Sequence, residues 1–241
     1  MNTTAVETPP VGEDEVLRQQ LIQDWKDHTK KPLMVRERLM DRLAIPMGDT
    51  ALIELSALGV HLFGEHMGDW AAGLDYLRQL EATHSDVSSE AKHRLKRQET
   101  LLKKAVDTGF SLSELNETDQ LYVTALSVPA VTLQKSAEEG LQLFRESDAL
   151  MEAIDTIEAR RLVAVMTANL VCDLLERYEL STAGRNLLVM LAEKSFALWS
   201  RDGNEEDRER AAFRLMQSYQ ACRKPQGFGS GRYPRYLWIE P

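Results

Sequence analysis

The chain has few cysteines and no long hydrophobic run. Cys172 and Cys222 are the only thiols among 241 residues, so no disulfide framework is predicted. The longest uncharged stretches, residues 121–134 and 162–172, fall short of the roughly 18 apolar residues that a membrane span requires. The first residues lack a basic start followed by an apolar core, so no signal peptide is predicted. We therefore expect a cytoplasmic protein that does not have a membrane as its partner.

The chain also has fewer basic than acidic residues. The chain has 29 Lys and Arg residues against 38 Asp and Glu residues, which gives a formal net charge of -9. Nucleic acids and anionic membrane surfaces both require clustered basic residues, so this composition disfavours either as the main partner. Hydrophobic residues at 43% and charged residues at 28% are typical of a folded domain that buries its own core.

Strand signals are nearly absent. No β-branched run alternates with polar residues, and the Asp202-Gly203 pair lies between predicted helices, not between strands. Apolar residues recur instead at helical spacings of three and four, as Leu17, Leu21 and Trp25 do. The predicted fold is all-α, with about ten helices stacked as antiparallel hairpins or packed as an irregular bundle.

Three parts are predicted along the chain. Residues 1–12 are expected to be a disordered leader, and residues 13–224 a single α-helical domain with a candidate subdivision near residues 110–130. Residues 225–241 form a tail that is rich in glycine and aromatic residues.

Capping residues and prolines predict where individual helices begin and end. Asp49 and Asp69 are predicted N-caps, and Ser111 with Glu114 has the spacing of a capping box. Pro129 is expected to end a short helix that covers residues 121–126. Ser147 is expected to cap a long helix that covers residues 150–180 and breaks near Arg160.

One stretch resembles a known family. The segment Gly68-Asp69-Trp70-Ala71-Ala72-Gly73-Leu74-Asp75-Tyr76-Leu77 has a small and an acidic residue before an aromatic one, then a small residue, Leu and Tyr. It resembles the turn and second helix of a tetratricopeptide repeat, and the resemblance covers roughly residues 50–82. The family prefers Ala at the positions of Gly73 and Leu80. A second, weaker match to the motif follows after about 79 residues, whereas the family repeats every 34 residues. The resemblance implies stacked helical hairpins, and an irregular bundle remains the alternative.

Small residues predict that two helices in this region pack closely. Gly59 and Gly64, on a helix expected over residues 49–67, would face Ala71, Ala72 and Gly73 on the next helix. The two helices would then enclose an apolar interface formed by Leu58, Leu62 and Leu74.

Histidines next to acidic residues are the candidates for metal chemistry. Glu81 with His84, and Glu90 with His93, each have the spacing found in half of a helical di-metal site, but they flank one short turn and are expected to be solvated helix ends. His61 and His66 are five residues apart, which is about 140° of rotation on an α-helix, so their rings are expected to point apart. Glu65 is expected only to hydrogen-bond His61. No catalytic residue, metal site or cofactor is predicted.

The aromatic tail is the predicted binding segment. Residues of the types enriched at interface hot spots follow its glycine run: Arg232, Tyr233, Arg235, Tyr236 and Trp238. Whether they pack on their own domain or on another chain is left open.

The sequence favours a non-catalytic protein–protein interaction module, an adaptor, chaperone-like or regulatory protein that binds a partner peptide or helix. One alternative is a structural helical subunit that forms a homo-oligomer. The other is a helical metal-dependent enzyme that uses the two Glu-x-x-His pairs.

Overall fold

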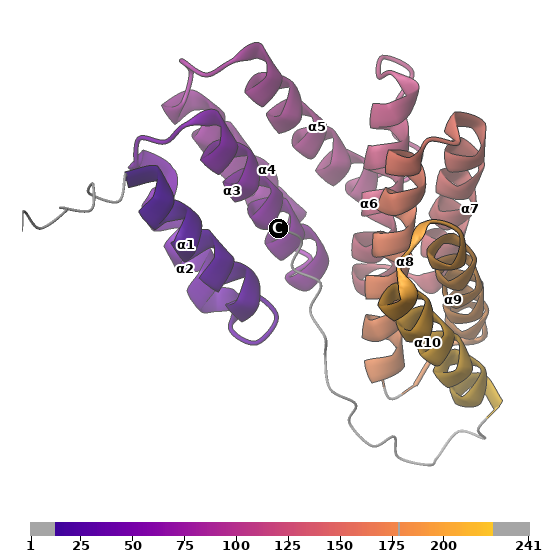
Figure 1. Cartoon of the computed structure of the whole chain (residues 1–241). Coiled ribbons are helices and arrows are strands. Elements are labelled where there is room, and N and C mark those ends of the chain that lie inside the picture. Colours follow the sequence, from indigo (N-terminus) through magenta and orange to yellow (C-terminus); the bar gives the residue numbers. More distant parts are fainter. Residues whose placement is uncertain (1–12, 178, 224–241) are drawn as a thin grey trace, which may run out of the picture.

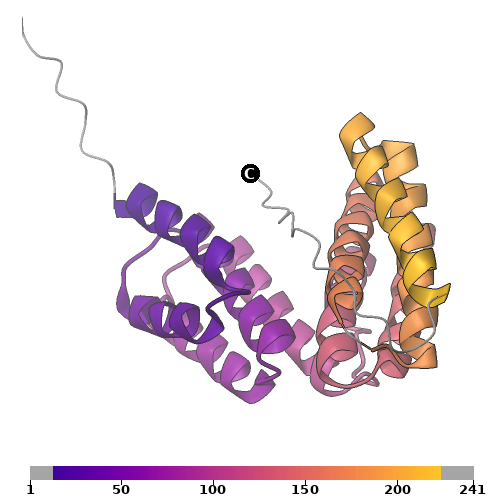
Figure 2. The same ribbon diagram turned by 90° about the horizontal axis from the view of Figure 1, so that it is seen from below.

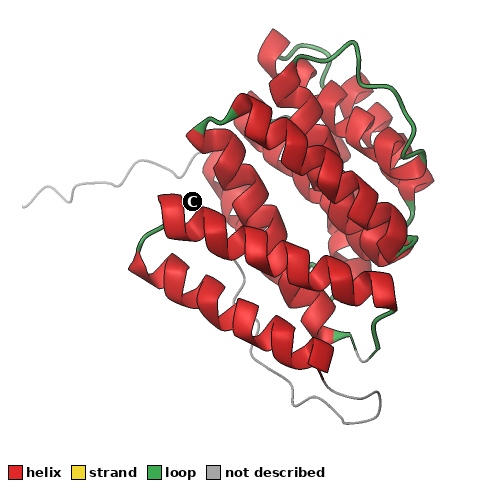
Figure 3. Ribbon diagram, turned by 90° about the vertical axis from the view of Figure 1, so that its right-hand side faces the viewer, coloured by secondary structure: helices red, strands yellow, loops and turns green. Residues whose placement is uncertain are grey.

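The computed structural model describes residues 13–177 and 179–223, and every regular element in this part of the chain is helical (Figure 3). The predicted all-α fold is confirmed. The helices are α1 (Glu13–Asp27), α2 (Pro32–Asp41), α3 (Asp49–Val60), α4 (Trp70–Thr83), α5 (Ser89–Val106), α6 (Glu117–Gln134), α7 (Ala137–Ile154), α8 (Ile157–Glu176), α9 (Thr182–Asp202) and α10 (Glu205–Arg223). A 3₁₀ turn, η1 (Arg42–Ala44), follows α2, and a π-helical turn, η2 (His61–His66), continues α3.

The described helices enclose two hydrophobic cores. The first lies among α1–α5 and includes Leu39, Leu55 and Leu80, which are fully buried. The second lies among α6–α10. Figures 1 and 2 show the two halves, with α5 and α6 where they meet. Helix α6 supplies buried side chains to both cores, since Val123 belongs to the first and Val128 to the second.

The predicted close packing of α3 against α4 is present at Gly59, whereas Ala71, which the prediction places in the interface, is exposed. A Cβ atom at Gly59 would lie 2.4 Å from the Tyr76 ring, and one at Gly73 would lie 3.0 Å from the Phe63 Cβ. The helix expected over residues 49–67 is nevertheless wrong in its second part, because α3 changes to π-helical geometry at His61. The tetratricopeptide resemblance stays a prediction.

Helix α6 begins and ends elsewhere than predicted. It is capped by Asn116, whose side chain accepts a hydrogen bond from the Asp119 backbone N–H, and not by Ser111. It continues through Pro129 to Gln134. An interior proline costs about 3 kcal/mol, but its neighbours Val128 and Val131 are fully buried, and burial of one such side chain contributes about 1.5–3 kcal/mol. Core packing therefore outweighs the local preference.

The expected long helix over residues 150–180 is divided at Asp155, which has a left-handed backbone with φ of 44°. Arg160, where a break was predicted, lies inside α8 and donates to both the backbone oxygen and the carboxylate of Asp155. Thr156 caps α8, whereas Ser147 is buried within α7 and bonds the Phe144 backbone oxygen. None of the described helices is long and apolar enough to cross a membrane.

Candidate metal centre

Three histidines converge at the end of the first core. His28 follows the last turn of α1, and His61 and His66 begin and end η2. The Nε2 atom of His61 lies 3.0 Å from the Nε2 atom of His28 and 3.0 Å from the Nε2 atom of His66. All three candidate ligand nitrogens lie within 4.8 Å of one another. We call these residues the histidine cluster.

The expectation that His61 and His66 point apart is wrong, and the cause is the π-helical turn. The Met67 backbone N–H bonds the Leu62 oxygen at 3.0 Å, a bond between residues i and i+5. In this geometry a residue five positions on lies about one turn further along the same face, so His66 comes to lie beside His61. Such turns occur often at functional sites.

Neighbouring helices hold the π-helical turn in place. The Trp70 indole N–H donates to the Gly64 backbone oxygen at 3.2 Å, and the Gln134 side-chain amide donates to the Glu65 backbone oxygen at 2.5 Å. These bonds satisfy carbonyl groups near the end of the helix. They tie the turn to α4 and to α6.

The Nδ1 atoms of two cluster members have acceptors as partners. His28 Nδ1 lies 2.5 Å from the Trp25 backbone oxygen, and His61 Nδ1 lies 3.1 Å from the Glu65 carboxylate. Carbonyl and carboxylate oxygens only accept hydrogen bonds, so a proton on each Nδ1 atom satisfies these two contacts. In a neutral ring that is protonated on Nδ1, the Nε2 atom is an acceptor and can be a metal ligand.

When both rings are neutral and protonated on Nδ1, the Nε2 atoms of His28 and His61 would present two lone pairs to each other across 3.0 Å. Two acceptors at this distance repel one another, and only a cation between them, a shared proton or a metal ion, turns the contact into an attraction. Ligands of a tetrahedral zinc ion with Zn–N bonds of about 2.0–2.1 Å have their nitrogen atoms about 3.3 Å apart. The two distances from the His61 Nε2 atom, 3.0 Å each, are close to this value, and all three ligand atoms lie within 4.8 Å of one another.

The surroundings of the histidine cluster favour positive charge. Burial would lower the pKa of His61, but the charge and hydrogen bond of Glu65, together with the charge of Asp173 on α8, outweigh burial and raise it. Burial would raise the pKa of Glu65, but the charge and hydrogen bond of His61 and the charges of His66 and His28 outweigh burial and lower it. The C-terminal end of α1 also directs its negative dipole end toward this point.

The two Glu-x-x-His pairs are not brought together. His84 Nε2 bonds the Leu43 backbone oxygen at 3.1 Å, while His93 Nε2 pairs with Asp119 at 2.9 Å. In the described part of the chain, only His28, His61 and His66 form a cluster of three metal-ligating side chains. The sequence does not indicate His28 as a metal ligand, because it lies 33 positions from His61, its nearest cluster partner along the chain.

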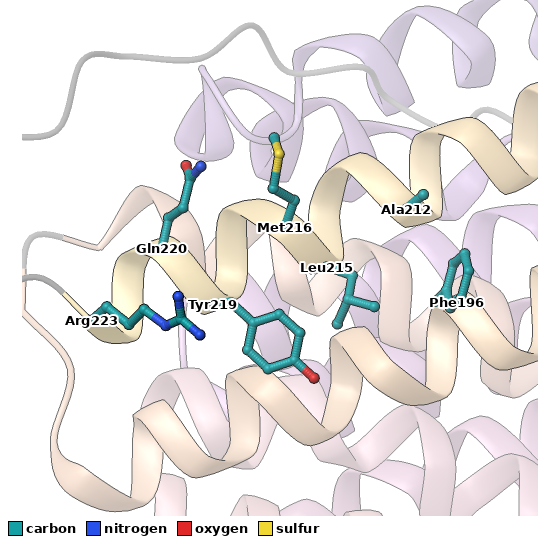
Figure 4. A pocket seen from close by; sticks show the side chains of 7 residues that line it. All are labelled: Phe196, Ala212, Leu215, Met216, Tyr219, Gln220 and Arg223. Atoms are coloured by element: carbon teal, nitrogen blue, oxygen red, sulfur yellow. The ribbon is translucent and has the colours of Figure 1, made fainter.

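The predicted tail residues Arg232, Tyr233, Arg235, Tyr236 and Trp238 lie outside the described residues. The described part of the chain does contain an apolar groove between α9 and α10 (Figure 4). It has a volume of about 440 Å³ and is lined by Phe196, Ala212, Leu215, Met216, Tyr219, Gln220 and Arg223. Three of the large apolar side chains that line the groove are exposed, namely Phe196, Met216 and Tyr219.

Comparison of the chain with protein-family models, with curated proteins and with solved structures finds no match. The geometry of the histidine cluster and of the groove therefore carries the functional conclusion.

Proposed function

We propose that the protein binds a divalent transition-metal ion of the zinc class through His28, His61 and His66. The observation that supports this proposal is the 3.0 Å contact between the Nε2 atoms of His28 and His61, two atoms that are both acceptors when the rings are neutral and protonated on Nδ1. An ion between them would relieve the repulsion, and the His66 Nε2 atom is equally close to His61. Three imidazoles are a known protein ligand set for zinc.

The donor types select the class of ion. Imidazole nitrogen suits Zn²⁺, Cu²⁺, Ni²⁺ and Fe²⁺, whereas Mg²⁺ and Ca²⁺ prefer oxygen ligands. The histidine cluster offers three nitrogens, and its carboxylate, Glu65, is bonded to the far side of the His61 ring. A carboxylate in that position orients the ring and increases its basicity as a ligand.

Isothermal titration calorimetry of chelator-treated full-length protein with zinc tests the proposal. We expect one ion to bind per chain. Zinc affinity should fall by more than about 100-fold in each of the variants His28→Gln, His61→Gln and His66→Gln. The reason is that loss of a metal ligand costs more than the 10–100-fold lost with a group that only supports a ligand. His93→Gln, which changes a histidine outside the cluster, is the matched control. Circular dichroism of each variant shows whether it is folded. A folded wild-type protein that binds no zinc would show that the histidine cluster holds only protons.

We also propose that the chain binds another protein chain through the α9–α10 groove, and that the occupant is a second copy. This proposal takes up the alternative expected from the sequence, a helical subunit that forms a homo-oligomer. The first turn of α10 carries Glu205, Glu206 and Asp207, and its last turn carries Arg223. An antiparallel pair of α10 helices that sets the acidic turn of one copy against Arg223 of the other would place Met216 of one copy opposite Phe213 of the other. Opposed helix dipoles add to this complementarity.

Light scattering tests the second proposal. We expect a dimer for the wild-type protein, a monomer for Met216→Glu, and a dimer for Leu33→Glu, which places the same charge on an exposed leucine of α2. Met216 is about half exposed, so the substitution leaves the core intact. A monomeric wild-type protein, or a dimer that persists in Met216→Glu, would refute this proposal.

A further inference from the structure

The histidine cluster supplies three donors, which is one fewer than a tetrahedral zinc ion takes. Among the described residues, no fourth His, Cys, Asp or Glu donor belongs to this group. Glu65 is directed to Nδ1 of His61, with the imidazole ring between its carboxylate and the three Nε2 atoms. Sites in which protein side chains provide three of four ligands hold a water or a substrate in the fourth position.

Burial of the cluster differs between its two sides. The His28 side chain on the α1 side is 3% exposed, and the Trp25 ring packs against it with centroids 5.4 Å apart. The His61 side chain is 27% exposed, and His66 is also partly exposed. An ion at the three Nε2 atoms would therefore have the buried His28 on its α1 side and two partly exposed imidazoles on the side of η2.

The charge at such an ion determines which ligands it takes. Zn²⁺ with three neutral imidazoles carries two positive charges, and the Glu65 carboxylate behind His61 neutralises one of them. The remaining positive charge favours an anion over a neutral ligand. Asp173 on α8 is the other negative group that acts on His61, and its charge weakens this preference, so a singly charged anion is expected to bind in place of a multiply charged one.

We infer that an ion held by His28, His61 and His66 keeps one exchangeable coordination position, which holds water and exchanges it for a small monoanion such as azide or a simple carboxylate. This inference rests on the proposed metal binding. It makes the centre one of the open type that metalloproteins use to bind or activate a small ligand, in contrast to closed sites that only support a fold.

Full-length protein loaded with Co²⁺, which replaces zinc and absorbs visible light, tests the inference. Calorimetry with Co²⁺ comes first, and sodium azide is then added while the visible spectrum is recorded. We expect a saturable spectral change with azide and with acetate, and none in Co²⁺-treated His66→Gln, where the ion itself is lost. His93→Gln is expected to respond as the wild type does.

The outcomes separate the two claims. If Co²⁺ does not bind, the proposed metal function fails, and this inference fails with it. If Co²⁺ binds with one ion per chain but the spectrum is unchanged by azide and acetate at concentrations well above those of the protein, the metal function stands and the exchangeable position is refuted.

Discussion

At the scale of single residues, Glu65 determines how His61 can act. Its carboxylate lies 3.1 Å from the His61 Nδ1 atom and fixes the proton there. This leaves Nε2 as the ligand atom, directed at His28 and His66. Glu65 is thus a positioning residue that acts through His61 without contact to the ion.

The variant Glu65→Gln tests this role. The amide can donate as well as accept, so it no longer holds the His61 proton at Nδ1. We expect zinc affinity to fall by about 10–100-fold, the usual effect of removing a group that orients a metal ligand. Calorimetry measures the affinity, and Glu81→Gln, an exposed residue on α4, is the control and should bind zinc as the wild type does. Unchanged affinity in Glu65→Gln would contradict the assignment.

Zinc binding should weaken as the pH falls. The pKa of His61 is raised above its ordinary value because Glu65 and Asp173 outweigh burial, and a protonated ring cannot bind a metal ion. In the metal-free protein the protonated form is the stabilised one. Its contribution to stability is therefore complete below the ordinary value of about 6.5 and is lost as the pH rises through the raised pKa.

Thermal unfolding with and without zinc checks the sign of this effect. We expect zinc to raise the Tm more at about pH 8 than at about pH 5.5. In metal-free protein, the Tm difference between the wild type and His61→Gln should shrink over the same rise in pH. A zinc effect that is equal at both pH values would show that the ion does not compete with protons at His61.

At the scale of helices, the sequence predicts the elements better than the site. Asp69 is correctly predicted as the N-cap of α4, since its side chain accepts a hydrogen bond from the Ala72 backbone N–H at 3.1 Å. The predicted cap Asp49 is instead the first residue of α3, after the N-cap Gly48. The sequence does not reveal the histidine cluster, because the α-helical rotation of 100° per residue, which points His61 and His66 apart, does not hold across residues 61–66. The π-helical geometry there depends on side chains of other helices, notably Trp70 and Gln134, which a local pattern cannot reveal.

The close contact of α3 with α4 can be tested by filling it. Gly59→Ala would place a Cβ atom 2.4 Å from the Tyr76 ring, which is itself fully buried. The ring would have to shift within a packed core, and we expect a loss of about 1–3 kcal/mol in the free energy of unfolding. Urea denaturation measures this loss.

Gly109→Ala is the matched control for that experiment. Gly109 is exposed in the connection before α6, and the nearest atom to an added Cβ would be the Asp107 carboxylate at 3.3 Å. We expect a change within about 0.5 kcal/mol. If both glycine variants have the same stability, the α3–α4 contact is looser than the structure shows.

At the scale of the whole molecule, α6 links the two cores. Its Val123 side chain is buried in the first core, while Leu121 and Val128 are buried in the second. The Arg97 guanidinium on α5 bonds the buried Asp119 carboxylate at the start of α6 at 3.0 Å. Because α6 cannot leave one core without uncovering the other, the two halves should unfold together, although the three residues of the histidine cluster lie on η2 and just after α1, in the first half.

Zinc should therefore stabilise the whole chain and not only the α1–α5 half. At a free zinc concentration about 100 times the Kd, binding adds about 2.7 kcal/mol, which corresponds to a rise in Tm of roughly 5–10 °C for a chain of this size. Far-ultraviolet circular dichroism follows all the helices at once, and hydrogen exchange of α8 and α9 amides reports on the second core alone. We expect one transition that moves as a unit and slower exchange in both halves. Two transitions, of which zinc moves only one, would show that α6 does not couple the cores and that the effect of the ion stays within the helices that bind it.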